Sequence, residues 1–376
     1  MKKRILALIL AAVLVIPAAL SLSSCTEKYD IVLNVYNWGE YMSIGNDPEL
    51  LNVPKAFENY YYETYGVRVK VNYDTYTSNE DLRAKLESGA INVDVIIPSD
   101  YMIEYFVKHD MLEKLDFSNI PLYSTSIGEG FRNLYYDPTN EYSVPYTYGM
   151  VGVIYDANTV KAEDVAAKDW SIMWNPAYHD KIIQFNNPRD AFGTSMYKLG
   201  IDVNTADKAE WDRAAADLKK QFADVSCCYY MDEIFNAMET GEMAVGAYYA
   251  GDYFTMRDEQ AEGVDLKFYY PEATNLYVDA MCIPKGAKNK TVAERFINFL
   301  LSEEAAIANA ETTYYASPNK TVYENADYKA YLDDAYDVLY PEGFDFFESY
   351  KKYAFRNLSD EMLDYMTSLW NSVKTH

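Results

Sequence analysis

Histidine and cysteine are scarce in this chain, which has three of the former and four of the latter among 376 residues. A His-based catalytic triad or a His-rich metal cluster therefore has little material from which to form. Apart from Cys25, the cysteines are Cys227, Cys228 and Cys282, an odd number without C-x-x-C spacing. This pattern indicates neither a disulfide framework nor a zinc site. A bridge from Cys282 to one of the adjacent pair stays open, but buried thiols are the simpler expectation.

Basic residues are few relative to acidic ones. The chain has 33 Lys and Arg against 58 Asp and Glu, a formal net charge of −25. This balance argues against nucleic acid and anionic lipid as binding partners, and it favours a cationic ligand. A solvated acidic surface would produce the same balance, so the net charge alone does not establish a cationic ligand.

Long apolar runs are missing after residue 25. The chain begins with a basic MKKR, an apolar run interrupted by Pro17, and the tetrapeptide LSSC ending at Cys25. These features resemble a bacterial lipoprotein signal peptide over residues 1–25, in which the cysteine is acylated and becomes the mature N-terminus. No later stretch approaches the about 18 apolar residues of a membrane span. We therefore expect a soluble body outside the cytoplasmic membrane, held there by a lipid anchor only.

Tyrosine, in contrast, is abundant. The chain has 38 Tyr against 16 Phe and 5 Trp. A buried phenol must find a hydrogen-bond partner, so this number exceeds what core filling alone requires. Some of these rings are expected to line a site that contacts solvent or ligand.

The first part of the chain predicts an α/β unit with a parallel sheet, because strand and helix patterns alternate there. Parallel sheets bind ligands at the carboxyl ends of their strands, where the motifs NWGEY and PSDY lie. The expected strands are 31–38, 67–76 and 93–99, and the expected helices are 54–66 and 78–89, the second with Ser78 as N-cap.

A second α/β section begins after residue 149. No Pro-, Gly- or Ser-rich linker separates the two sections, so we expect the chain to pass between two lobes more than once. Its expected strands lie near 150–155, 181–185, 244–249 and 277–284, and its helices near 191–199, 206–222, 231–239, 291–311 and 359–375.

Nine motifs follow one another along the chain: YNWGEY, YTSNEDLRAKL, VDVIIPSDY, YSVPYTYG, WSIMWNPAY, NNPRDAFG, VDAMCIPKGAKNK, FINFLLSEEAA and YYASPN. In this order and at these spacings they resemble the spermidine/putrescine-binding proteins of bacterial ABC importers. The resemblance implies a two-lobed α/β periplasmic-binding-protein fold of the cluster 2 type, with a ligand cleft between the lobes. One lobe is expected at 29–149 plus 278–323, and the other at 150–277 plus 324–376.

The resemblance also implies which side chains line the cleft. The residue that anchors an amine in the family matches Asp279, and the aromatic and hydroxyl positions match other motifs of this chain. Those positions are Trp38, Tyr41, Ser99, Tyr101 and Tyr315.

Several positions depart from the family pattern. A pair of carboxylates three residues apart is replaced by Asn187 and Asp190, and two pocket tryptophans are replaced by Tyr249 and Tyr277. Arg356 stands where a neutral amide is familiar. If its guanidinium reached the cleft and paired with a carboxylate, it would shorten the pocket and favour a diamine over a triamine.

A polyamine suits this combination of residue types. Its ammonium groups need carboxylates, and its methylene runs suit flat aromatic faces, which also attract cations by about 0.5–2 kcal/mol per contact. The expected function is therefore capture of putrescine or spermidine and delivery to the membrane permease of an ABC importer. The protein is expected to act as a monomer without a cofactor and without enzymatic activity.

Two other classes of function stay open on the residues alone. A ferric-ion-binding protein of the same general fold would use adjacent tyrosines, which Tyr248 and Tyr249 could imitate. A cleft hydrolase would use two carboxylates, such as Asp190 and Asp279, as acid and base. Nothing beyond those pairs supports either one.

Overall fold

The computed structural model describes residues 28–375, so the predicted leader and Cys25 lie outside the described residues. The described chain is a mixed α/β structure whose nine strands form one hydrogen-bonded series. The strands are β1 (Ile31–Trp38), β2 (Val69–Tyr76), β3 (Val95–Ile96), β4 (Ser143–Asp156), β5 (Ile182–Phe185), β6 (Cys228–Tyr230), β7 (Val245–Tyr249), β8 (Leu266–Tyr269) and β9 (Leu276–Cys282).

Helices surround these strands, and no described helix is long and apolar enough to cross a membrane. The α-helices are α2 (Val53–Tyr65), α3 (Asn79–Glu87), α4 (Asp100–Lys108), α5 (Tyr123–Ser126), α6 (Pro188–Leu199), α7 (Lys208–Val225), α8 (Glu233–Glu239), α9 (Ala250–Asp258), α10 (Lys290–Leu300), α11 (Glu303–Thr313), α12 (Lys320–Tyr323), α13 (Ala326–Leu332), α14 (Ala335–Leu339), α15 (Phe346–Tyr353) and α16 (Asp360–Lys374).

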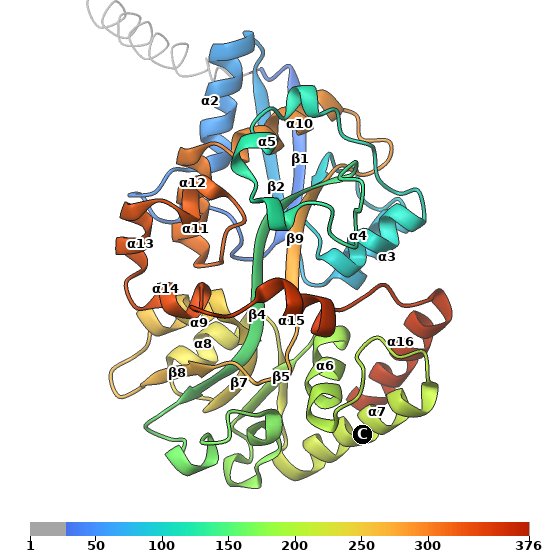
Figure 1. The fold of residues 1–376 in the computed structure, drawn as a ribbon, viewed down its shortest axis with the longest axis vertical. Helices are drawn as coiled ribbons and strands as arrows, with labels where there is room; N and C mark the ends of the chain where they lie inside the picture. Colours follow the sequence, from blue (N-terminus) through green and yellow to red (C-terminus); the bar gives the residue numbers. More distant parts are fainter. Residues whose placement is uncertain (1–27, 376) are drawn as a thin grey trace, which may run out of the picture.

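The molecule has two lobes joined by long strands, as the sequence predicts. Figure 1 shows β1 and β2 in the upper lobe, β5, β7 and β8 in the lower lobe, and β4 and β9 running between them. The first half of β4 pairs with β9, and its second half pairs with β7 and β8. Because one strand takes part in both halves of the series, the two lobes share a continuous hydrogen-bonded connection.

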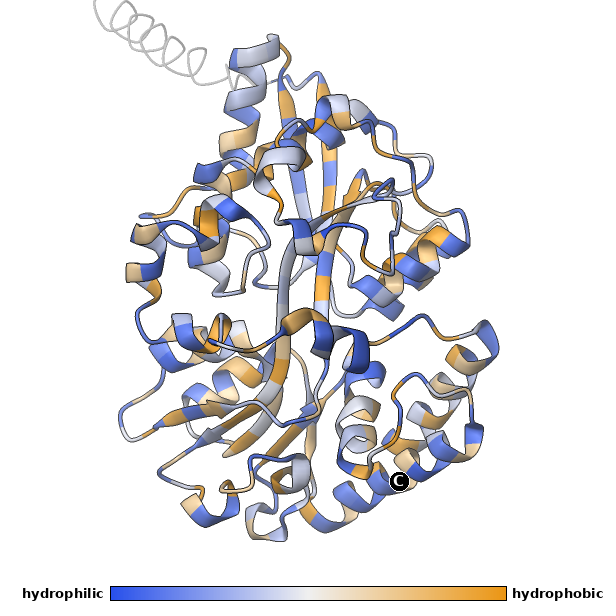
Figure 2. Cartoon of the chain, in the orientation of Figure 1, coloured by the Kyte–Doolittle hydropathy of each residue, from blue (hydrophilic) through white to orange (hydrophobic). Residues whose placement is uncertain are grey.

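The upper lobe has the expected parallel arrangement, with β1 pairing in parallel with both β2 and β3. The side chain of Ser78 accepts a hydrogen bond from the backbone N–H of Asp81 at 3.1 Å, which caps α3 as predicted. Gly66 ends α2 with φ of 67°, a left-handed conformation that glycine adopts without steric cost. Hydrophobic residues concentrate on the strands, and the outer helices show mixed faces (Figure 2).

The segment 291–311, expected as one helix, forms two helices, α10 and α11. The break lies at Ser302, whose backbone is extended (φ −63°, ψ 149°) and whose hydroxyl donates to the carbonyl of Phe299 at 2.6 Å. Glu303 and Glu304 occupy the first turn of α11, where negative charge interacts favourably with the helix dipole. An N-cap residue followed by two acids therefore begins a new helix inside an apolar pattern that looked continuous.

Two short helices lie where the chain is expected to return to the lower lobe. α13 packs against α11, α12 and α14, and α14 also packs against α9. The expected boundary between residues 323 and 324 falls at the end of α12 and stays a prediction.

Cysteine forms no disulfide within the described residues. Cys227 and Cys282 are buried free thiols, as expected, and Cys228 is a half-buried free thiol. The alternative of a bridge from Cys282 to the adjacent pair is therefore wrong.

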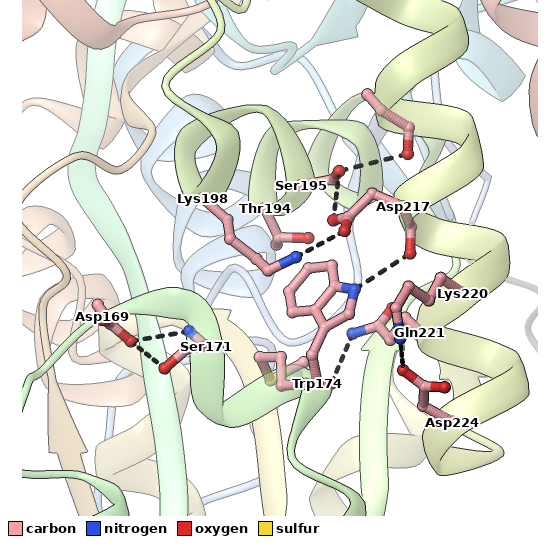
Figure 3. Close-up of polar contacts among 12 residues, drawn as sticks. Asp169, Ser171, Trp174, Thr194, Ser195, Lys198, Asp217, Lys220, Gln221 and Asp224 are labelled. Carbon is pink, nitrogen blue, oxygen red and sulfur yellow. Dashed lines mark hydrogen bonds and ion pairs between the residues drawn. The ribbon is translucent and has the colours of Figure 1, made fainter.

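Polar contacts hold α6 firmly against α7 and the 3₁₀ helix Trp170–Trp174 (Figure 3). Asp217 accepts hydrogen bonds from Ser195 Oγ at 2.9 Å and from Lys198 Nζ at 2.6 Å. The carbonyl of Asp217 also accepts from Trp174 Nε1 at 3.1 Å. These contacts fix the body of α6, whose N-terminal end reaches the pocket between the lobes.

Candidate ligand-binding site

A pocket of about 720 Å³, including its open mouth, lies between the lobes and is lined by residues of both. Ten of the eleven expected ligand-binding residues lie in its wall. They are Trp38, Tyr41, Ser99, Tyr101, Asn187, Asp190, Tyr249, Tyr277, Asp279 and Tyr315.

The pocket is found where the carboxyl ends of parallel strands from both lobes converge. Trp38 is the last residue of β1, and Ser99 follows β3 in the same lobe. In the other lobe, Tyr249 is the last residue of β7, and Asn187 follows β5, which pairs with β7 in parallel. Ligand sites of open α/β sheets form at such ends, because the chain leaves the sheet there and exposes its side chains.

Six carboxylates line the pocket, and its lining contains no lysine or arginine among the residues that the structure describes. Four of these acids are buried, whereas Glu40 and Asp232 are exposed. A wall of this composition has a negative potential that attracts cations and repels anions. The buried acids are Asp100, Asp190, Asp252 and Asp279.

Asp279 is held by a tyrosine and not by a basic residue. Its Oδ2 accepts a hydrogen bond from the hydroxyl of Tyr41 at 2.5 Å, and that hydroxyl also lies 2.5 Å from Thr147 Oγ1. Its Oδ1 is buried without a hydrogen-bond partner among the described residues. Burial raises the pKa of Asp279 to about 6, and the hydrogen bond from Tyr41 opposes that rise. The carboxylate is therefore oriented but not neutralised.

The same arrangement recurs at two further carboxylates. Tyr249 donates to Asp190 Oδ2 at 2.9 Å, and Tyr315 donates to Asp252 Oδ2 at 2.7 Å. A phenol O–H is a neutral donor, so it positions a carboxylate without supplying a competing positive charge. The abundance of tyrosine noted in the sequence thus has a specific use at this site.

Burial is the main cause of the raised pKa values of these acids. It raises the pKa of Asp190 to about 7, with a smaller contribution from the charges of Glu80 and Asp279. It raises the pKa of Asp252 to about 8, with a smaller contribution from the charges of Asp232 and Glu40. Asp190 is therefore close enough to Glu80 and Asp279, and Asp252 close enough to Asp232 and Glu40, for their charges to interact.

Aromatic rings occupy the space between the acids. Trp38 donates from Nε1 to the carbonyl of Ile97 at 3.0 Å, which fixes the indole, and its ring lies 4.7 Å from that of Tyr76. The ring centroids of Tyr41 and Tyr315 lie 4.8 Å apart, and the two rings meet edge to face. Such faces can cover methylene groups and attract ammonium groups at the same time.

Asn187 and Asp100 also have structural roles. The side-chain oxygen of Asn187 accepts from the backbone N–H of Arg189 at 3.1 Å, so it caps α6. Asp100 accepts from the hydroxyl of Tyr350 at 2.7 Å and from the N–H of Val278 at 3.1 Å. These bonds tie the start of α4 to β9 and α15 at the back of the pocket.

Arg356 does not reach the pocket, so the expectation for this residue is wrong. Its guanidinium carbon lies 3.3 Å from the centroid of the Tyr135 ring, and its backbone N–H donates to Asn204 Oδ1 at 2.7 Å. The preceding residue, Phe355, lines the pocket instead. Side chains alternate in direction along an extended segment, so a shift of one residue reverses which one faces the ligand.

The nearby Arg189 is buried but does not neutralise Asp190 by a direct ion pair. Its guanidinium donates to the carbonyl of Val203 and to Asn204 Oδ1, each at 2.8 Å, and it lies 4.5 Å from the ring centroid of Phe355. It therefore positions the segment that carries Phe355.

Asp252 is the main pocket residue that sequence reasoning missed. It lies three residues after Tyr249, in the first turn of α9, which begins directly after β7. An acid that lies one helical turn after the end of a predicted strand could have indicated this pocket residue from the sequence. Asp232 lies two residues after β6, a strand that was not among those expected from the sequence, so it had no such signal.

The tyrosine pair that a ferric site would require is engaged elsewhere. The hydroxyl of Tyr249 donates to Asp190, and that of Tyr248 lies 3.5 Å from Asp232. Burial raises the pKa of Tyr248 and of Tyr249 well above the usual value, which disfavours the phenolate that binds iron. No group of three or more His, Cys, Asp or Glu within 28–375 could hold a metal ion.

Two α/β lobes, crossing strands and an acidic aromatic pocket between the lobes define a solute-binding protein. The chain belongs to the bacterial extracellular solute-binding protein family, whose model matches residues 55–333. It is therefore an extracytoplasmic substrate-binding protein of the kind that serves ABC transporters, and not an enzyme.

The relatives agree with this assignment. The chain is 31% identical to the spermidine/putrescine-binding periplasmic protein of Escherichia coli K12 over 305 residues, which cover 80% of this chain and 81% of the relative. It is 26% identical to the putrescine-binding periplasmic protein SpuD of Pseudomonas aeruginosa over 358 residues, 92% of each chain. A solved structure, a putative spermidine/putrescine ABC transporter from Listeria monocytogenes, is 30% identical with a TM-score of 0.77, covering 92% of this chain and 99% of that one.

Proposed function

We propose that this protein captures polyamines, putrescine or spermidine, outside the cytoplasmic membrane and delivers them to the permease of an ABC importer. The observation that carries the proposal is the pocket lining, which within residues 28–375 has six carboxylates, a set of aromatic rings and no basic residue. Relatives that are 26–31% identical over most of the chain carry names that specify spermidine and putrescine.

The ligand's apolar part accounts for only some of the affinity. Burial of four methylenes contributes roughly 3 kcal/mol, at about 0.8 kcal/mol each. Micromolar binding requires about 8 kcal/mol. The remainder must come from the ammonium groups, which suffer a large desolvation cost in a closed pocket unless each finds a carboxylate.

The arrangement of acids suits a ligand with separated positive charges. Asp279 Oδ1 and Asn275 Oδ1 are buried acceptors without partners among the described residues, and both belong to the pocket wall. An ammonium N–H satisfies such acceptors directly. A second ammonium group would reach Asp252, whose oxygen Oδ2 is held by Tyr315.

We further propose that Cys25 is acylated and that the protein acts as a monomer on a lipid tether. The LSSC tetrapeptide after an apolar run supports the anchor. We also propose the lobe limits 29–149 plus 278–323 and 150–277 plus 324–376. Residues 149 and 150 lie within β4 and residue 277 lies within β9, the two crossing strands, which supports the first two limits.

Thermal unfolding in the presence of candidate ligands tests the ligand class. Putrescine and spermidine should raise the melting temperature, because they bind only the folded protein, whereas neutral sugars and γ-aminobutyrate should not. The variant Asp190→Asn should reduce the rise, and the variant Asp364→Asn, at an exposed site on α16, should not. Lack of any rise with millimolar polyamine would overturn the proposal.

A further inference from the structure

A second cavity, of about 660 Å³ including its opening to solvent, adjoins the ligand pocket. Its wall comes from β4, from the start of α9, and from the segment that links α14 and α15. Unlike the ligand pocket, it has no charged side chain in its lining among the residues described. Its rings are Tyr148, Tyr270, Tyr277, Tyr315, Tyr340, Phe344 and Phe346.

Two tyrosines separate this neutral cavity from the acidic pocket. Tyr277 and Tyr315 belong to the walls of both, each is only 5% exposed, and their ring centroids lie 6.4 Å apart. We call this pair of rings the partition.

Each ring of the partition rests on a glycine. Tyr277 on β9 pairs with Gly149 on β4, and a Cβ added to Gly149 would lie 2.6 Å from the Tyr277 hydroxyl oxygen. A Cβ added to Gly251 in α9 would lie 2.3 Å from Cδ2 of Tyr315. Since any other residue at these two positions would displace the rings, the two glycines allow the partition to close.

The two tyrosines differ in their polar contacts. The hydroxyl of Tyr315 donates to Asp252, which faces the ligand pocket. The hydroxyl of Tyr277 is buried without a hydrogen-bond partner among the described residues, and it lies against Gly149, a residue of the neutral cavity. The partition therefore offers a carboxylate on one side and only neutral groups on the other.

We propose that the partition sets the length and end-group specificity of the ligand pocket, and that the cavity behind it is a latent subsite for an uncharged end group. This inference rests on the proposed polyamine function. An ammonium group cannot enter the neutral cavity without losing its carboxylate, whereas an aromatic end group would pack against the rings there. Removal of the Tyr277 ring joins the two spaces.

Calorimetric titration with putrescine, spermidine and N-benzylputrescine tests the partition. Wild type should bind the two parent amines at least tenfold more tightly than the benzylated amine. Tyr277→Ala should weaken the parent amines through lost ring area and should improve the ratio of benzylated to parent affinity by at least tenfold. Tyr315→Leu is the second variant, should Tyr277→Ala fail to fold by circular dichroism.

Two control variants distinguish the partition from a general loosening of the site. Tyr249→Ala enlarges the ligand pocket alone, and Tyr340→Ala enlarges the neutral cavity alone, so neither should shift the ratio. The partition is overturned if folded Tyr277→Ala has the same ratio of benzylated to parent affinity as wild type. The polyamine function still stands in that case, provided that wild type binds the parent amines. If wild type binds neither parent amine, both fail.

Discussion

The hydroxyl of Tyr41 donates a 2.5 Å hydrogen bond to Oδ2 of Asp279, which follows it by 238 residues in the chain. Tyr41 lies three residues after the end of β1 in the upper lobe, and Asp279 lies on the crossing strand β9. The bond orients one carboxylate oxygen and leaves Oδ1 buried and unpartnered among the described residues. Because the donor is neutral, the negative charge remains available to a ligand.

Removal of that charge should weaken polyamine binding strongly. Asp279→Asn keeps the shape of the side chain, so we expect affinity to fall by one to three decades, at about 1.4 kcal/mol per decade. Tyr41→Phe keeps the charge of Asp279 and the aromatic ring, so its loss of polyamine affinity should be smaller. Isothermal titration calorimetry measures both, with Asp364→Asn as the exposed control. Equal affinity in Asp279→Asn and wild type would show that Asp279 does not contact an ammonium group.

Binding should tighten as pH rises from 6 to 8. The pKa values of Asp279, Asp190 and Asp252 are raised to about 6, 7 and 8, so these acids are partly protonated in the empty pocket near neutrality. Polyamine ammonium groups, like that of lysine, stay charged over this range. Ligand binding should therefore release protons, which titration in buffers of different ionisation enthalpy measures. Asp190→Asn should reduce the number released, and pH-independent binding would contradict the prediction.

The empty protein should become less stable over an overlapping range. A buried acid with a raised pKa binds more protons in the folded state than in the unfolded state, so the free energy of unfolding falls as pH rises from about 4 toward 8. Saturating polyamine should offset this loss by pairing with the carboxylates. Denaturant unfolding at several pH values, with and without ligand, measures this change in the free energy of unfolding. A free energy of unfolding that rises between pH 6 and 8 without ligand would contradict the prediction.

Trp38 should report ligand binding through its fluorescence. It is the only one of the five tryptophans in the pocket wall, and all five lie within the described residues. Polyamine should change the emission of wild type, and Trp38→Phe should lose that change while it keeps part of the affinity through the remaining ring. Trp174→Phe, which alters a residue packed against α6 and α7, is the control and should retain the change. Retention of the full change in Trp38→Phe would place the ligand elsewhere.

A larger residue at Gly39 should hold the lobes apart. A Cβ at Gly39, in the upper lobe, would lie 2.6 Å from Oδ2 of Asp232, in the lower lobe. The exposed carboxylate of Asp232 can rotate away from a Cβ alone, so the variant is Gly39→Leu, whose longer side chain should keep the lobes apart, lower ligand affinity and leave a larger radius of gyration at saturating ligand than wild type has. Small-angle scattering measures this. The double variant with Asp232→Ala should recover part of the closure, and a radius identical to wild type would refute the steric reason.

Arg356 should have little influence on ligand choice. Its guanidinium stacks on Tyr135 outside the pocket, so Arg356→Gln should leave the affinities for putrescine and spermidine within about twofold of wild type. A shift of preference toward spermidine, measured by titration of both amines, would show that the side chain reaches the ligand after all.

Local patterns in the sequence were sufficient for much of the fold, whereas the ten residues of the pocket wall were expected from the resemblance of the motifs to a known family. Strand ends such as Trp38 and Ser99 could be predicted because period-two alternation and helix caps such as Ser78 are encoded within a few residues. The carboxyl ends of parallel strands then necessarily face one region. The break at Ser302 was missed because the apolar pattern continues across it, and only the new N-cap reveals the change.

By itself, the sequence determined the α/β class, the two lobes, the acidic charge and the aromatic character of the ligand site. Only the tertiary structure decided that tyrosine hydroxyls hold Asp190, Asp252 and Asp279, that Phe355 and not Arg356 faces the pocket, and that Tyr277 and Tyr315 close off a second cavity. The physical reason is that the hydrogen bonds join residues 59 to 238 positions apart, and that the other two relationships depend on the direction of single side chains. Neither is encoded in a local pattern, because both depend on how segments distant in the sequence pack within and between the lobes.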